Sequence, residues 1–184
     1  MSGLIVPPGR GRKLVTKAQE VTFKVTGADG SFASIFEVTV PPGFDVGAHT
    51  HAQAEFFYVL EGELDLFAFE PVKRTQDRWQ DWESPDGERV VRASAGSCMF
   101  VPGGCPHAFT NPTSKPARML FQSSPAPDHE RYFEELVEIF ANGRTVDSGA
   151  VQRLRDRYHL SQITPLRYGP VPLLNPGREK EDQP

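Results

Sequence analysis

Three of the five histidines lie in two short segments, and one of these segments also holds a carboxylate. His49 and His51 are separated by one residue and followed by Glu55, whereas His107 comes much later in the chain. Alternate residues of a strand share a face, so the first two imidazoles point the same way and Glu55 keeps their parity if the strand is uninterrupted. A buried carboxylate among neutral imidazoles is costly without a counter-charge, and a divalent cation supplies one. The pattern therefore predicts a metal site formed by His49, His51, Glu55 and His107.

A bland alternative exists for each histidine. A His-x-His pair in a strand is often only solvated or packed, and this spacing alone is a weak motif. Here the pair is accompanied by a carboxylate and by a third histidine in a turn framed by proline and glycine, Pro102-Gly-Gly-Cys-Pro-His107, which favours metal binding. His129 and His159 have no such company, and we interpret them as helix-surface residues.

The two segments resemble the paired motifs of the cupin superfamily, in its single-domain form. Residues 43–62 match Gly-x5-His-x-His-x3-Glu-x6-Gly, and residues 96–111 match Gly-x5-Pro-x-Gly-x2-His-x3-Asn, with no departure at a fixed position. The resemblance covers about residues 21–123. It implies an all-β fold, the double-stranded β-helix or jelly-roll barrel, whose interior holds one divalent metal ion on residues matching His49, His51, Glu55 and His107.

The same resemblance assigns structural work to other motif positions. The glycines would serve turns in which a missing Cβ permits positive φ, namely Gly62, Gly96 and Gly104. Pro102 would end a strand before the loop that presents His107. Asn111 is expected to be structural rather than a ligand.

Alternating patterns and turn residues predict the strands of this barrel. We expect strands over 21–25, 32–40, 55–60, 63–69, 89–93, 98–101, 107–111 and 117–123. Apolar residues at helical spacing then predict a helix over 128–141 and a second from 147 or 148 to 158. We expect a single domain over 1–184, with an N-terminal arm (1–20), the barrel (21–124), C-terminal helices (128–160) and a tail (161–184).

The long polar segment from Glu70 to Glu88 contains Trp79 and Trp82 among charged residues. The two tryptophans could form a lid over a pocket. Long compact loops are usually packed by their own side chains, which favours packing on the outside of the barrel.

Composition excludes several classes of function. Of the 184 residues, 38% are hydrophobic and 24% charged, and the net charge of −4 comes from interleaved signs, so we expect no nucleic-acid partner. No apolar run reaches the length of a membrane span or of a signal-peptide core, which makes a cytoplasmic location the expectation. Cys98 and Cys105 are therefore expected to be free thiols.

Four protein ligands on a metal that accepts about six leave positions for substrate or dioxygen, which favours an enzyme. Phe57, Val59 and Phe109 share parity with the ligands and would line an apolar substrate pocket, although ordinary core positions would look the same. The sequence does not name the metal, because iron, manganese, nickel, copper and zinc all accept these ligands.

The single barrel followed by helices is similar to quercetinase-type dioxygenases. This resemblance implies a dioxygenase acting on a small aromatic or flavonol-like molecule, with Glu55 as ligand and catalytic base and the helix over 128–141 flanking the pocket mouth. It also implies a homodimer. A non-redox metal-dependent isomerase, cyclase or lyase is the first alternative, and a small-molecule binding module without turnover is the second.

Overall fold

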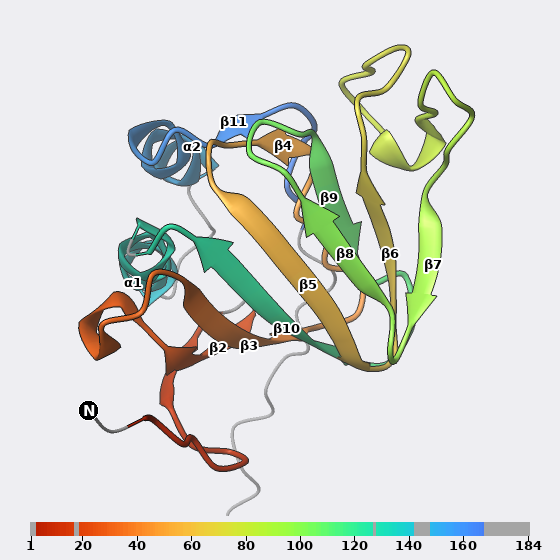
Figure 1. Cartoon of the computed structure of the whole chain (residues 1–184). Helices are drawn as coiled ribbons and strands as arrows, with labels where there is room; N and C mark the ends of the chain where they lie inside the picture. The colour runs from red at the N-terminus through yellow and green to blue at the C-terminus, as the bar shows by residue number, and fades with distance from the viewer. Residues whose placement is uncertain (1–2, 17–18, 127, 142–147, 168–184) are drawn as a thin grey trace, which may run out of the picture.

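The computed structural model describes residues 3–16, 19–126, 128–141 and 148–167. Two antiparallel sheets face each other (Figure 1). The larger has the order β1-β2-β3-β10-β5-β8 and the smaller the order β11-β4-β9-β6-β7. The larger sheet comprises β1 (Arg12–Val15), β2 (Glu20–Val25), β3 (Ser34–Val40), β10 (Ala117–Ser124), β5 (Ala54–Glu61) and β8 (Cys98–Val101). The smaller comprises β11 (Ser161–Gln162), β4 (His49–Thr50), β9 (His107–Thr110), β6 (Glu63–Ala68) and β7 (Val91–Ser94).

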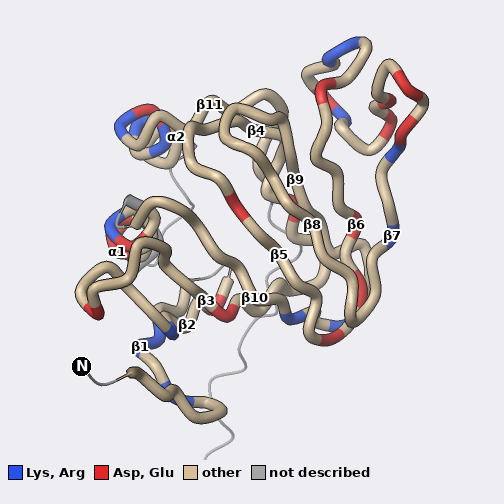
Figure 2. Tube along the Cα trace, viewed as in Figure 1, with Lys and Arg blue, Asp and Glu red and all other residues tan. Residues whose placement is uncertain are grey.

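The core lies between the two sheets and follows from the period of two in the strands. Every second residue of β3 and β10 is buried, and Phe36 on β3 stacks on Phe121 of β10 with ring centroids 5.4 Å apart. The charged residues lie mainly in turns, helices and the long loop (Figure 2). The all-β jelly roll with C-terminal helices is thus confirmed. The strand predicted from 32 begins at Ser34, because Phe32 is exposed before the sheet starts.

Turns at the motif glycines set the strand register. Gly62 joins β5 to β6 with φ of 78°, and an added Cβ would lie 3.0 Å from Ala117, so the turn needs glycine for both conformation and space. Asn111 directly follows β9 and is fully buried. Its Nδ2 donates to the carbonyls of Val40 at 2.9 Å and Lys115 at 2.8 Å. The structural role expected for Asn111 is confirmed.

The 70–88 segment packs on the outer face of the smaller sheet. It includes the short 3-10 helix η2 (Trp79–Asp81), and a second one, η1 (Gly27–Asp29), lies between β2 and β3. Trp79 and Trp82 are 1% and 2% exposed and pack against Phe67 of β6. The residues on either side of Phe67 face the core between the sheets, so Phe67 itself points to the outer face. Packing on the outside of the barrel is therefore confirmed, and the tryptophans are not a lid.

The helices α1 (Asp128–Ala141) and α2 (Ser148–Arg157) lie together beside one end of the barrel (Figure 1). Phe133 of α1 meets Phe36 edge-on with centroids 5.3 Å apart, so the apolar face of α1 extends the barrel core. Both helices match the sequence prediction, α2 ending one residue before Tyr158. None of the helices that the structure describes is long and apolar enough to cross a membrane.

Both segments predicted to flank the barrel contribute strands to it. In the predicted arm, β1 pairs with β2. In the predicted tail, β11 pairs with β4, and Arg167 bridges to Asp45. Such short edge strands pair through backbone groups and carry no side-chain period, so the sequence does not reveal them. The rest of the expected tail, residues 168–184, lies outside the described residues.

Candidate metal centre

The four predicted ligands come from both sheets. His49 on β4 lies directly opposite His107 on β9 in the smaller sheet, whereas Glu55 belongs to β5 of the larger one. The chain crosses from one sheet to the other between β4 and β5, and His51 stands at the start of this crossover. The condition under which Glu55 would keep the parity of the two histidines, one uninterrupted strand from His49 to Glu55, is therefore not met. The ligands meet because two facing sheets each present an inward side.

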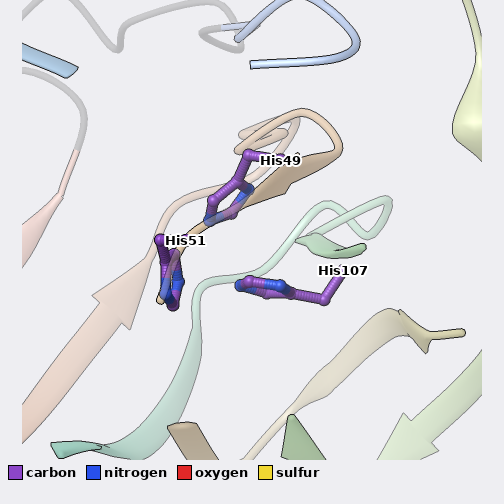
Figure 3. Close-up of side chains that lie close together, drawn as sticks. All are labelled: His49, His51 and His107. Carbon is purple, nitrogen blue, oxygen red and sulfur yellow. The ribbon is translucent and has the colours of Figure 1, made fainter. Parts of the chain in front are cut away.

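The side chains of this group converge inside the barrel. One ring nitrogen of each of His49, His51 and His107 lies within 4.8 Å of the others, and Figure 3 shows the three rings turned toward one another. His51 Nε2 lies 3.0 Å from Glu55 Oε1, and His107 Nε2 lies 3.0 Å from Glu55 Oε2. All four side chains are buried. The structure thus brings together every ligand that the sequence predicts.

Backbone carbonyls orient two of the imidazoles. His49 Nδ1 donates to the Gly47 carbonyl at 2.9 Å, and His107 Nδ1 donates to the Cys105 carbonyl at 2.9 Å. A carbonyl only accepts, so Nδ1 carries the hydrogen and Nε2 keeps its lone pair for a metal ion. Cys105 serves here through its backbone; burial raises the pKa of its free thiol, and Cys98 is free as well, as expected.

The long outer loop supports His49 through a chain of hydrogen bonds. Trp79 Nε1 and the Gly47 amide both donate to Asp45 Oδ1 at 2.8 Å. Gly47 in turn accepts the His49 hydrogen bond on its carbonyl. The 70–88 segment therefore stabilises the backbone that orients a ligand, although it does not cover the cavity.

Unsatisfied ring nitrogens show that the cluster suits a cation. Three ring nitrogens make no hydrogen bond within the described part of the chain: Nδ1 and Nε2 of His51, and Nε2 of His107. The two Nε2 atoms lack one although each lies 3.0 Å from a carboxylate oxygen of Glu55. A buried polar atom without a partner is costly, and a divalent ion would satisfy several at once. Three imidazoles and one carboxylate are also a donor set that first-row transition metals accept. The residues present therefore fit one divalent metal ion.

The electrostatics of the cluster match this use. Burial lowers the pKa of His49 well below its ordinary value, and His107 and Arg155 lower it further. Burial alone would raise the pKa of Glu55, but the contacts with His107, His129 and His51 outweigh it and hold that pKa well below its usual range. A neutral His49 imidazole and an ionised Glu55 carboxylate are the protonation states in which these two side chains can bind a metal ion.

His129 corrects the sequence interpretation. We predicted a helix-surface residue, but His129 is only 8% exposed, and its Nε2 lies 3.1 Å from Glu55 Oε1. Its Nδ1 pairs with the Ser123 hydroxyl at 2.8 Å. The signal was present in the sequence, since His129, Tyr132, Phe133 and Leu136 follow the i, i+3, i+4, i+7 spacing of the buried helix face. His159 is exposed as expected, but it lies in a turn two residues after the end of α2 rather than on a helix.

The cluster opens onto an apolar cavity of about 70 Å³. Its walls include His49, Glu55, Phe57 and Phe109, so two of the three predicted pocket residues line it. Val59 does not line the cavity. It lies two residues after Phe57 on the same face of β5 and is 1% exposed in the barrel core. Other walls come from α1 and α2, so α1 lines this cavity, while its place at the mouth of a substrate pocket stays a prediction. These walls include Tyr132, Phe133, Leu136, Val151 and Arg155.

Comparison with known proteins shows the family. The cupin family model matches residues 9–148, so the chain belongs to the cupin family. No curated protein sequence matches it significantly.

Solved structures share this fold at low sequence identity. A predicted oxalate decarboxylase from Thermotoga maritima is 19% identical with a TM-score of 0.50, covering 67% of this chain and 100% of its own. The polyketide cyclase RemF from Streptomyces resistomycificus is 21% identical with a TM-score of 0.52, covering 68% of this chain and 83% of its own. An RmlC-like cupin from Shewanella frigidimarina is 16% identical with a TM-score of 0.50, covering 70% and 96%. At these identities the likeness concerns the fold alone.

Proposed function

We propose that the protein is a metal-dependent enzyme that binds a compact, largely apolar substrate beside His49, His51, Glu55 and His107. The observation that carries this proposal is the opening of the ligand cluster onto an apolar cavity, since His49 and Glu55 are themselves part of its wall. A purely structural metal site is normally enclosed by its ligands. Here a ligand set with free coordination positions would face a space shaped for a small molecule.

Our leading reaction class is dioxygenation, in keeping with the resemblance drawn from the sequence. A bound metal would supply the redox chemistry and polarise a coordinated oxygen of the substrate. Glu55, ionised and buried, is placed to accept a proton from that substrate. Phe57 and Phe109 would hold an apolar ring and exclude water. A volume of about 70 Å³ favours a single ring or a smaller molecule over a three-ring flavonol.

A non-redox isomerase, cyclase or lyase is the second candidate, and the His129 contact favours it. An imidazole 3.1 Å from the Glu55 carboxylate gives a proton a path between two side chains. Reactions that only move protons and break or form carbon bonds need such a path and no dioxygen. In this case the metal would act as a Lewis acid.

Metal content and turnover with and without oxygen test the proposal. The protein is purified without chelators or a nickel column, its metal is identified, and compact catechols and hydroxy acids are supplied in air and under nitrogen. The matched variants are His107→Ala at the site and His159→Ala on the surface. We expect turnover that chelation and His107→Ala abolish and His159→Ala leaves unchanged.

The outcomes separate the candidates. Turnover that stops under nitrogen supports the dioxygenase, and turnover that continues under nitrogen with zinc supports the second candidate. A tightly bound molecule recovered unchanged would instead indicate a binding module. Turnover that stays at the level of the metal-loaded wild type after chelation and in His107→Ala would refute a metal-dependent reaction. The expected homodimer is tested separately by light scattering on the same preparation.

A further inference from the structure

A second polar group lines the cavity and takes no part in the metal cluster. Arg155 lies in the last turn of α2, is 4% exposed and borders the same cavity as His49 and Glu55. Its Nε donates to the Tyr132 hydroxyl at 3.4 Å, a long contact, and its Nη1 has no hydrogen-bond partner. Among the residues that the structure describes, no carboxylate forms an ion pair with it.

The burial of the Arg155 guanidinium without an ion pair is energetically unfavourable, because no counter-charge offsets the loss of its hydration. The C-terminal end of a helix favours a cation, but an exposed side chain suffices for that. Arg157 in the same turn shows this, being largely exposed and paired with Glu135. Arg155 is instead turned into the cavity, where its free donors face the space for a ligand.

We propose that Arg155 binds the carboxylate of a compact monoanionic substrate whose other end reaches the metal centre. The inference rests on the proposed function, because it takes this cavity to be the substrate pocket. Guanidinium offers parallel N–H donors that match a carboxylate. The Tyr132 hydroxyl accepts from Arg155 and so keeps its own hydrogen for the same anion.

The cavity favours a carboxylate over a phosphate. Outside the metal cluster, the described wall holds two basic side chains, Arg155 and His129. His129 Nε2 already lies 3.1 Å from Glu55 Oε1, so Arg155 is the one left to match a single negative charge. A phosphate monoester carries about −1.5 to −2 charges at neutral pH and needs more donors than one guanidinium and one hydroxyl provide. Phe57, Phe109 and Phe121 offer only apolar contacts to the part of the substrate between the two polar ends.

An open depression adjoins the cavity at this arginine. It has a volume of about 490 Å³ and shares Val151, Arg155 and Leu166 with the inner cavity. Its walls come from α2, from the segment that contains β11 and from the 70–88 segment, where Asp77 is its one acidic wall residue in the described chain. An anion that enters from this side meets Arg155 before it reaches the metal cluster. Arg155 would therefore select substrates as well as orient them.

The test uses butanoate and its neutral isostere butanamide as probes, with binding followed by NMR titration and by the shift in Tm. The full-length protein is titrated both with its metal and after chelation, so that binding at Arg155 is separated from binding at the metal. Wild type is compared with Arg155→Met, Arg155→Lys and, as the control on the same helix turn, Arg157→Gln. We expect butanoate to bind wild type and Arg157→Gln at least about 10-fold more tightly than Arg155→Met, with or without metal.

The neutral probe and the thermal stability of the variant provide two further tests of the role of Arg155. Butanamide should bind about 10-fold more weakly than butanoate to wild type, a comparison that needs no variant. Arg155→Met should be at least as heat-stable as wild type, because it removes a buried uncompensated charge; a clear loss of Tm would assign Arg155 a structural role instead. Equal binding of the two probes, or no effect of Arg155→Met on butanoate, would overturn the inference. Butanoate binding through Arg155 in a protein that binds no metal would refute the metal-dependent function and leave this site standing.

Discussion

Gly103 offers a sharp test of how the loop before β9 holds the metal centre. The residue is not a fixed position of the cupin motif, yet a Cβ added to it would overlap the Ala52 carbonyl oxygen and lie 3.2 Å from the Ala52 carbonyl carbon. Ala52 follows His51, whose carbonyl accepts a hydrogen bond from the Gly104 amide at 2.7 Å. Gly103→Ala must therefore push the crossover that carries His51 by roughly 1 Å to restore normal contact distances.

That displacement predicts a loss of metal affinity. Ligand geometry has to hold within about 0.5 Å, and supporting contacts of this kind change metal affinity by roughly 10–100-fold. At a metal concentration of about 100 times the wild-type Kd, binding stabilises wild type by about 2.7 kcal/mol. A 10–100-fold weaker site leaves about 1.4 to 0.4 kcal/mol. For a chain of this size the wild-type Tm should rise by about 5–11 °C on metal addition, and the variant Tm by about 1–6 °C.

The assay is thermal denaturation with EDTA and with added metal, supported by direct metal titration. Gly96→Ala is the matched control: its φ of 93° makes it strained, but an added Cβ meets nothing within 4 Å. It should lower the Tm of the chelated protein and keep the full metal-dependent rise. A Gly103→Ala variant that binds metal as tightly as wild type would refute the reasoning, because the overlap with Ala52 would then not reach His51.

Three other side-chain contacts lead to predictions, those of His129, Glu37 and Trp79. His129→Gln should weaken metal binding about 10-fold, because it disturbs the carboxylate of Glu55, whereas His159→Gln should leave a metal titration unchanged; equal affinities would show that His129 does not position the ligand. Glu37→Gln should lower the free energy of unfolding by up to about 1 kcal/mol at pH 7. The pKa of Glu37 is lowered from 4.5, chiefly by Arg118, so this difference should be full above pH 4.5 and vanish as the pH falls through the lowered pKa in urea titrations; a constant difference would contradict it. Trp79→Phe removes the pyrrole ring of the buried indole, and with it both packing and the Nε1 donor to the Asp45 carboxylate. It should lower the free energy of unfolding by at least about 1–3 kcal/mol in the same titrations, and an unchanged stability would show that neither the packing nor the hydrogen bond is needed.

The sequence by itself determined the barrel and the four side chains that gather inside it. Alternation along the strands places Phe36, Val38 and Val40 on one face whatever the partner strand is, because the side-chain period of a strand is a local property. The motif spacing likewise predicts the candidate metal ligands, since glycine and proline define the turns that present them. The helix over 128–141 follows from its apolar period.

The tertiary structure decided which inward-facing residues share a site. Local period indicates that His129 and Arg155 lie on the apolar faces of α1 and α2, but not that these faces close one end of the barrel above Glu55. It indicates that Val59 faces inward, but not that it lies deeper than the cavity. Depth along a barrel and the identity of the opposite wall depend on contacts between segments far apart in the chain, and one sequence read by its local patterns does not contain them.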